Sequence, residues 1–515
     1  MSLLSAVAVR AERRTPDIPL PSPAIRVTSG AVRSAPAAHV GAAPLLPVVG
    51  GDLPVPLVTG ETRAYANLDY AASAPCLSDV AAHLAQVAPY YASVHRGAGY
   101  ASRVSTARYE HARAQVAAFV GARADDVVVF TRNTTDALNL LARCVPGRTE
   151  DGAEGNESEG STTAPDAGDV LFLDIEHHAN LLPWRRGRHR CVVAGTTQRA
   201  TLVALRAELA ARPAALVAIT GASNVTGEVL PLAEIVAAAH QAGARVVLDA
   251  AQLAPHRRID LTASGVDYVA FSGHKLYAPL GSGALVGRRD WLDAAPAYLP
   301  GGGAVREVTL TGTTWADAPQ RHEGGTPNVL GAAALGQACE TLAALPDGAL
   351  AAHEEALRAR LVARLDALPG VHRHRIWRDS PDAIGVVAFS VDGYHPGLVA
   401  AYLSAEHGIG VRDGKFCAHP LLSRLGAPDG TLRASFGVGS KLADVDRLAD
   451  AVEDLLVAGP RWEYAVVDGR WEPVGDTRPV PEWAGTTTDG ADGAASLGGF
   501  AGTGGGSPCE HEARP

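Results

Sequence analysis

Lys275 is the residue of this chain with the most specific chemistry, because it is one of only three lysines among 515 residues, with Lys415 and Lys441. It follows the mostly apolar run Val266–Phe271, which is typical of a buried strand. Arginine supplies nearly all the other positive charge, but a guanidinium stays protonated and is a poor nucleophile. A lysine amine can instead form a Schiff base with a carbonyl compound. Lys275 therefore indicates covalent carbonyl chemistry. The alternative interpretation is a surface lysine without a chemical role.

A carboxylate follows the neighbouring strand. Asp249 comes directly after the residues Arg245–Leu248, of which the last three are apolar. Lys275 stands 26 residues further on, after the next predicted strand. A carboxylate at a buried strand end needs a cationic partner. A protonated pyridine nitrogen is such a partner, and pairing with it keeps the ring an electron sink. Asp249 and Lys275 together are thus typical of a site for pyridoxal phosphate, whose aldehyde a lysine binds.

Other polar segments also follow predicted strands. Thr134 and Thr135 open a predicted helix, where free backbone N–H groups and hydroxyls suit a phosphate. An ordinary threonine N-cap is the alternative for that segment. The His177-His178 pair has no third metal ligand at a suitable spacing, so an imidazole stacked on an aromatic cofactor is the favoured interpretation. Asn224 offers an amide to a ring hydroxyl.

The elements that position these residues alternate between short β-branched runs and Ala/Leu-rich helical stretches. Such an alternation predicts βαβ units and a mostly parallel sheet covered on both faces, which is an α/β fold. The predicted strands are 126–131, 169–174, 216–220, 245–249, 268–271 and 284–286, and the predicted helices are 79–88, 106–120, 135–143, 201–211, 232–242 and 349–367. A smaller α+β pattern follows, with strands near 384–390 and 432–436 and a helix at 442–458.

This pattern predicts a large domain over residues 61–339, a small C-terminal domain over 340–460, and tails on either side. Residues 1–60 are expected to be a disordered extension, although 45–58 could lie against the core. Residues 461–515 are expected to be a tail that is disordered from about 477. The acidic, low-complexity segment 149–168 predicts a disordered loop insertion in the large domain.

Composition limits the function classes. With 47% hydrophobic and 19% charged residues and no apolar run of about eighteen, the chain is expected to be soluble, without a membrane span. The formal net charge of −10 argues against nucleic acid as the main ligand. The six cysteines are widely spaced, without CxxC, so no structural metal site is expected. Reduced thiols and the lack of a secretory pattern at the N-terminus predict a cytoplasmic protein.

An ordered series of motifs resembles one known family. EHHAN, SNVTG, DAAQ, SGHKLYAP, GGG and EGGTPN occur in this order between residues 176 and 328. The series resembles the class V, fold-type I pyridoxal-phosphate enzymes, and most closely the group II (SufS-type) cysteine desulfurases and selenocysteine lyases. The resemblance runs from about Asn67 to about Leu456. It implies a fold-type I transferase with a large mostly parallel-sheet domain and a smaller C-terminal α+β domain.

The resemblance also implies a role for each residue around the cofactor ring. Lys275 is expected to bind pyridoxal 5'-phosphate covalently and then to transfer the substrate's α-proton. Asp249 is expected to pair with the pyridinium nitrogen, and His177 to stack on the ring. Gln252, helped by Asn224, is expected to contact the ring hydroxyl.

Phosphate and substrate contacts are implied in the same way. The phosphate is expected to be held by Thr134, Thr135, Ser272 and His274, with Thr326 reaching across from a second subunit of a homodimer. Arg433 is expected to bind the substrate carboxylate in a bidentate fork. Arg412 and Arg96 are expected near the substrate.

Cys417 decides between reactions of this class. The desulfurase pattern places its nucleophile here, and a thiolate that attacks the substrate sulfur would turn L-cysteine into L-alanine and leave a persulfide on Cys417, to be passed to a sulfur-acceptor protein. Lys415 and Arg412 are close enough in sequence to favour the thiolate. Lys415-Phe416 replace the two histidines that usually precede this cysteine. The alternatives are an inert loop cysteine in a class V aminotransferase, epimerase or C–S/C–Se lyase, and a catalytically silent scaffold.

Overall fold

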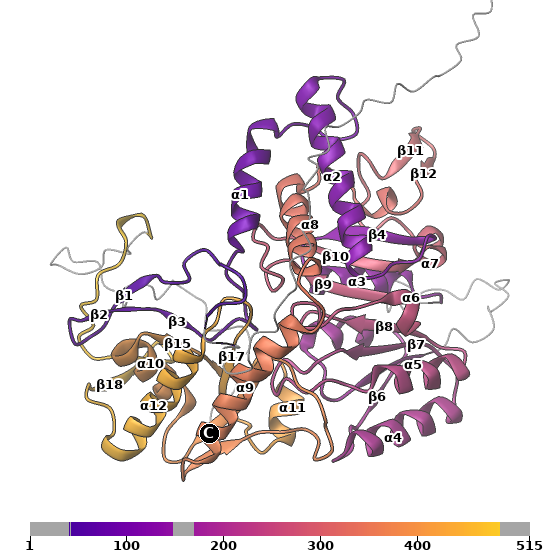
Figure 1. Cartoon of the computed structure of the whole chain (residues 1–515). Helices are drawn as coiled ribbons and strands as arrows, with labels where there is room; N and C mark the ends of the chain where they lie inside the picture. The colour runs from indigo at the N-terminus through magenta and orange to yellow at the C-terminus, as the bar shows by residue number, and fades with distance from the viewer. Residues whose placement is uncertain (1–40, 42, 148–168, 485–515) are drawn as a thin grey trace, which may run out of the picture. The chain divides into compact units, whose positions relative to one another are not determined.

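A seven-stranded sheet forms the centre of the larger half of the molecule (Figure 1). The computed structural model describes residues 41, 43–147 and 169–484. The strand order is β4-β10-β9-β8-β7-β5-β6, and all neighbours from β9 to β6 pair in parallel, whereas β10 is antiparallel to both β4 and β9. The strands are β4 (Asp126–Thr131), β5 (Asp169–Leu173), β6 (His189–Val192), β7 (Ala214–Thr220), β8 (Arg245–Asp249), β9 (Tyr268–Ser272) and β10 (Gly283–Arg288).

The predicted mostly parallel sheet is therefore confirmed. Every residue of β5 and β9 is buried, as expected for strands covered on both faces. Around the sheet lie α1 (Ser78–Val87), α2 (Tyr100–Phe119), α3 (Thr134–Cys144), α4 (Gln198–Ala211), α5 (Leu232–Gln241), α6 (Leu261–Ser264), α7 (Arg289–Ala294) and α8 (Val329–Ala343). Helices α2 and α8 lie side by side (Figure 1). A hairpin of β11 (Val305–Val308) and β12 (Thr313–Trp315) precedes α8.

The strand directions bring the polar segments to one edge. Because β4 and β9 are both antiparallel to β10, β4 runs in the same direction as the parallel strands. The carboxyl ends of β4, β5, β7, β8 and β9 consequently meet at the same edge, which is where ligands bind in open α/β sheets.

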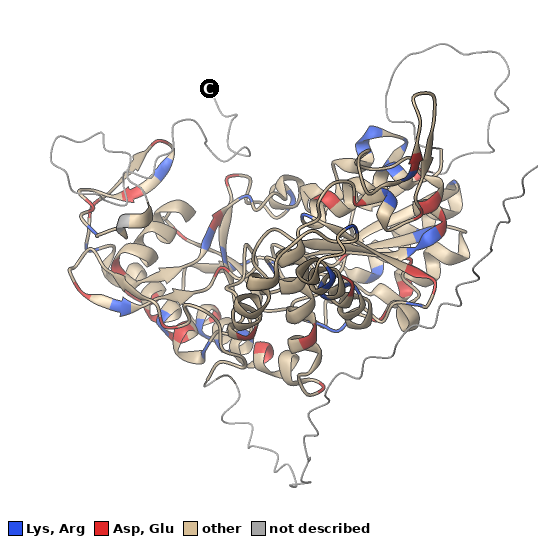
Figure 2. Ribbon diagram, turned by 90° about the horizontal axis from the view of Figure 1, so that it is seen from above, with Lys and Arg blue, Asp and Glu red and all other residues tan. Residues whose placement is uncertain are grey.

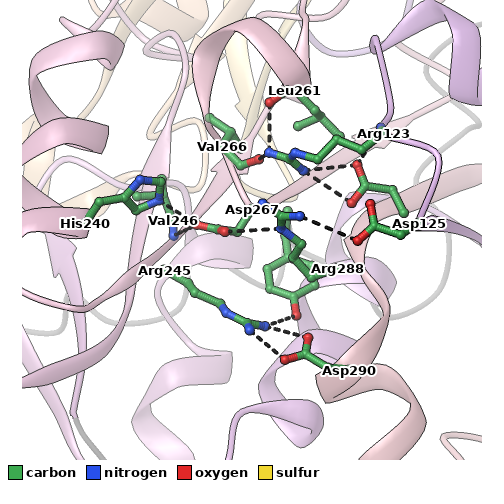
Figure 3. Close-up of polar contacts among 12 residues, drawn as sticks. Arg123, Asp125, His240, Arg245, Val246, Leu261, Val266, Asp267, Arg288 and Asp290 are labelled. Carbon is green, nitrogen blue, oxygen red and sulfur yellow. Dashed lines mark hydrogen bonds and ion pairs between the residues drawn. The ribbon is translucent and has the colours of Figure 1, made fainter.

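At the opposite edge of the sheet, where β8 and β9 begin, charged side chains form an ion-pair network (Figure 3). Asp267, just before β9, accepts hydrogen bonds from the backbone N–H of Val246 (3.0 Å) and from Nε2 of His240 (2.9 Å). Arg245 binds Asp290 through both terminal nitrogens, at 2.8 and 2.6 Å. This network lines a hollow of about 520 Å³. Its charged groups are paired with one another, so it joins β8, β9 and α7.

A second, four-stranded antiparallel sheet has the order β13-β14-β17-β16. Its strands are β13 (Val371–Arg373), β14 (Val386–Val391), β16 (Arg412–Gly414) and β17 (Thr431–Ser435), and the accompanying helices are α9 (Ala349–Asp366), α10 (Pro396–His407), α11 (His419–Arg424) and α12 (Leu442–Ala458). The segment β3 (Ala66–Asn67) pairs in parallel with β15 (Ile409–Gly410). Residues 66–67 thus lie beside residues 409–410, which come much later in the chain. Basic and acidic residues are interspersed along the ribbon (Figure 2).

Three predicted boundaries are wrong. The disordered N-terminal extension to residue 60 does not reach that far, because Leu45 and Leu46 donate backbone hydrogen bonds to Val438, Leu57 is buried, and β1 (Pro54–Pro56) pairs with β2 (Thr62–Ala64). The alternative that 45–58 lies against the core is confirmed. Residue 339, the predicted end of the large domain, falls inside α8.

The third boundary lies in the C-terminal tail. Strands β18 (Tyr464–Val467) and β19 (Arg470–Pro473) form a hairpin against α10. Order continues past residue 477, since Arg478 forms a buried ion pair with Asp476. The predicted loop insertion 149–168 and the rest of both tails lie outside the described residues. No helix within 43–147 and 169–484 is long and apolar enough to cross a membrane.

Candidate active site

Lys275 stands on a tight turn directly after β9. Gly273 donates its N–H to the carbonyl of Ser282 at 2.7 Å, and a Cβ on Gly273 would lie 2.6 Å from the Ser282 hydroxyl, so glycine is required for this close approach. Burial lowers the pKa of Lys275 to about 8, although the Asp249 carboxylate acts in the opposite direction. A substantial fraction of the amine is therefore neutral near physiological pH, which is the nucleophilic form.

Asp249 provides a buried negative charge at the end of β8. Asp249 is 3% exposed, and its carboxylate accepts a hydrogen bond from the backbone N–H of Ala251 at 2.9 Å. Burial raises its pKa, and the charge of Lys275 opposes that rise. Among the described residues it has no ion-pair partner within 4 Å, so the site is suited to a ligand that brings a positive charge.

His177 follows β5 and is held as a neutral imidazole. Its Nδ1 accepts a hydrogen bond from the backbone N–H of Ala179 at 3.0 Å, which fixes the ring at the start of a short 3₁₀ turn. Burial lowers its pKa to about 3, with further contributions from the charges of Lys275, His178 and Arg433. A fixed, neutral ring of this kind is suited to stacking on an aromatic ligand.

Hydroxyls gather where α3 begins. The Ser272 hydroxyl accepts the N–H of Thr134 at 2.8 Å, and the two hydroxyl oxygens lie 2.6 Å apart. Thr135, next along the helix, is exposed, and His274 is partly buried with a pKa lowered by burial. These groups, together with the N-terminus of an eleven-residue helix, are suited to a phosphate.

Arg433 on β17 forms the opposite wall and is 3% exposed. Its Nη1 donates to the backbone carbonyl of Asn224 at 2.8 Å, and its Nη2 donates to Asp69 at 3.1 Å. Its Nε is buried and has no hydrogen-bond partner in the described chain. A buried guanidinium with an unused N–H is ready to bind a carboxylate.

Cys417 lies on the loop before α11. Its carbonyl accepts the N–H of His178 at 2.9 Å, which ties the loop to the segment that carries His177. The thiol influences the pKa values of both Lys275 and Arg433, so the cysteine shares the electrostatic environment of these two groups. The structure therefore brings together a lysine, a carboxylate, an imidazole, an arginine and a thiol.

Some predicted residues have other partners. The side-chain amide of Asn224 donates to the carbonyl of Phe416 at 2.8 Å, and that of Gln252 donates to the carbonyl of Ala71 at 2.9 Å. Both side chains are buried, and both hold the walls of the site.

Three further predicted residues are exposed, as Thr135 is. Arg412 pairs in register with Arg433 across β16 and β17, and its charge affects the pKa of Arg433. Arg96 lies next to the glycines at 302 and 303. Thr326 lies on the loop before α8.

Sequence reasoning missed two carboxylates. Asp69 pairs with Arg433 across a sequence separation of 364 residues. Glu176 is fully buried, with its pKa raised well above the usual value by burial, and it accepts hydrogen bonds from Asn180 (2.7 Å) and from the Thr220 N–H (3.1 Å). Glu176 is the first residue of the EHHAN motif, and Asp69 lies near the start of the region that carries the resemblance, so these positions were the available signal.

Comparison with known proteins agrees with this geometry. Residues 66–448 match the family model described as aminotransferase class-V, and the chain belongs to that family. A cysteine desulfurase of Dickeya dadantii is 39% identical over 370 residues, which cover 70% of this chain and 84% of that protein. A probable cysteine desulfurase 2 of Mycobacterium leprae is 40% identical over 369 residues, with the same coverage.

Solved structures give the same result. The cysteine desulfurase CsdA from Escherichia coli is similar with a TM-score of 0.66 and 33% identity, over 76% of this chain and 94% of that one. The apo cysteine desulfurase from Thermococcus onnurineus is similar with a TM-score of 0.67 and 32% identity, over the same shares. The predicted class V family and fold-type I architecture are thus confirmed.

Proposed function

We propose that this chain is a pyridoxal-phosphate-dependent cysteine desulfurase that converts L-cysteine to L-alanine and holds the sulfur as a persulfide on Cys417. The observation that carries the proposal is that Asp249, Arg433 and Cys417 surround Lys275, since the charges of all three contribute to the pKa of the lysine. A covalent amine, a ring-pairing carboxylate, a carboxylate receptor and a thiol are what this reaction requires.

The residues present fit pyridoxal phosphate. Asp249 would pair with the ring nitrogen, His177 would stack on the ring, and Thr134, Thr135, Ser272 and His274 would hold the phosphate. Lys275 would bind the aldehyde carbon. When bound, the cofactor supplies a ring that withdraws electrons from the substrate's α-carbon.

The chain's own residues then perform the remaining tasks. Arg433 binds the substrate carboxylate through its unused Nε–H and orients the substrate. Lys275 moves the α-proton, a role that its lowered pKa favours.

Cys417 performs the sulfur transfer. Its thiolate attacks the substrate sulfur, so that a sulfur–sulfur bond forms and the bond between the substrate's Cβ and sulfur breaks. The electron pair of that bond stays with the carbon fragment, which takes up a proton and leaves as alanine. The persulfide is then available to a sulfur-acceptor protein.

A test begins with protein loaded with pyridoxal phosphate and given L-cysteine, with and without a thiol reductant. We expect stoichiometric alanine, and sulfide only after the reductant is added. Loaded protein that leaves cysteine untouched would instead favour a class V aminotransferase, epimerase or lyase.

A homodimer in the cytoplasm completes the proposal. Thr326 and Arg96 are exposed, so both side chains are accessible to a second copy, which supports a role for them at its site. Sedimentation velocity of the loaded protein tests this assembly: a monomer with full activity would contradict it.

A further inference from the structure

Phe416 and Cys417 have an unusual backbone conformation. Both have φ of +51°, in the left-handed region that non-glycine residues rarely adopt. Such residues cost free energy and persist only where their surroundings hold them. The contacts that hold this loop therefore indicate the function of its backbone conformation.

Two hydrogen bonds hold the loop from the large sheet's side. The Asn224 amide donates to the Phe416 carbonyl at 2.8 Å, and the His178 N–H donates to the Cys417 carbonyl at 2.9 Å. The first of these bonds is buried, so its loss would leave polar groups unsatisfied.

The third contact is made by the phenyl ring. The guanidinium carbon of Arg433 lies 4.9 Å from the centre of the Phe416 ring, and Phe416 is 9% exposed. Arg433 in turn donates to the backbone carbonyl of Asn224 at 2.8 Å. Asn224, Phe416 and Arg433 consequently form a closed triangle, in which each residue contacts the other two.

We infer that Phe416 is a positioning residue that fixes the distance between the nucleophile Cys417 and the carboxylate receptor Arg433. Its ring holds the guanidinium through a cation–π contact, and its carbonyl is held by Asn224. The inference rests on the proposed function, because it takes Arg433 as the group that binds the substrate carboxylate. A cationic side chain at this position would repel Arg433, whereas a neutral ring attracts it.

The test compares Phe416→Leu, which keeps an apolar side chain without a ring, with Phe416→Tyr, which keeps the ring. For Phe416→Leu we expect the KM for L-cysteine to rise roughly 2- to 30-fold with a much smaller change in kcat, the range expected for a cation–π contact. Phe416→Tyr should stay close to the unchanged protein. An unchanged KM in Phe416→Leu, or a fall in kcat alone, would overturn the link to Arg433.

A second measurement needs no turnover. Iodoacetamide alkylation of Cys417 can be followed by mass spectrometry in the tryptic peptide Phe416–Arg424, with Cys191 in Cys191–Arg199 as an exposed control thiol. We expect Cys417 to react several-fold faster in Phe416→Leu, because the loop is released, while Cys191 is unaffected. Equal Cys417 rates in all three proteins would overturn the inference. Should the unchanged protein fail to convert cysteine, the proposed function fails, and these rates still decide whether the ring holds the loop.

Discussion

Asp69 and Arg433 form an ion pair of 3.1 Å although 364 residues separate them in sequence. Burial raises the pKa of Asp69, and the neighbouring Arg433 opposes that rise. The Asp69 carboxylate therefore orients the Arg433 guanidinium. The Asp69 side chain itself is 24% exposed.

The first prediction concerns this pair. Asp69→Asn removes the negative charge, so Arg433 loses a charged hydrogen bond and its preferred orientation. We expect the KM for L-cysteine to rise roughly 10- to 100-fold, in line with the free energy of a charged hydrogen bond. Asp413→Asn, which removes a nearby carboxylate that forms no ion pair with Arg433 in the described chain, is the matched control. Equal steady-state constants for the two variants would show that Asp69 does not position the arginine.

The second prediction concerns Lys275 and pH. Because burial lowers its pKa from the ordinary 10.5 to about 8, the amine is protonated below about pH 8 and neutral above it. The rate at which cofactor-free protein binds pyridoxal phosphate, followed by visible absorbance, should rise with pH up to about 8 and then level off. Asp249→Asn should move the levelling to lower pH, since Asp249 raises the lysine pKa. A rate in the unchanged protein that kept rising towards pH 10.5 would contradict a buried amine.

The third prediction separates stability from function at Asp249. In the cofactor-free protein, this carboxylate is buried, and burial raises its pKa. A raised pKa means that the carboxylate's ionisation destabilises the fold, and this cost is present at pH values above its folded pKa. Asp249→Asn should therefore increase the free energy of unfolding at neutral pH by about 1 kcal/mol. Urea unfolding of the cofactor-free proteins measures the change.

The same variant should lose activity. Without the charge that we propose as the partner of the ring nitrogen, kcat should fall by more than about 100-fold. Asp249→Asn that was both less stable and fully active would contradict the assigned role on both counts.

The fourth prediction tests the opposite edge of the sheet (Figure 3). Asp267→Asn weakens the bonds from Val246 and His240. It removes a buried carboxylate whose ion-pair partners are partly exposed. We expect a loss of about 2 kcal/mol in the free energy of unfolding, the range for hydrogen bonds to a charged group. The KM for L-cysteine should not change, because this network lies at the far end of the strands. A large KM effect would mean that the two edges are coupled.

The sheet could be predicted because its signals are local. β4 and β8 match the predicted strands at both ends, and α12 matches the predicted helix at both ends, since apolar runs and helical periodicity are written within each segment. The polar residues after β8 and β9 were found for the same reason, because their positions follow from the strand ends.

The walls of the site could not be predicted because their contacts are long-range. Asp69 meets Arg433, and Gln252 binds the carbonyl of Ala71, only after distant segments have packed. The left-handed backbone of Phe416 has no sequence signal, because glycine is the residue that usually marks such a conformation. The β18–β19 hairpin was missed because its flanks are rich in turn-forming residues.

Persulfide formation on Cys417 is measured by the mass of the tryptic peptide Phe416–Arg424 after loaded protein has reacted with L-cysteine without reductant. We expect one added sulfur atom on this peptide, one alanine released for each sulfur bound, and neither product in Cys417→Ser. Alanine formed by Cys417→Ser at the normal rate, or an unmodified peptide in protein that has released alanine, would contradict sulfur transfer to Cys417.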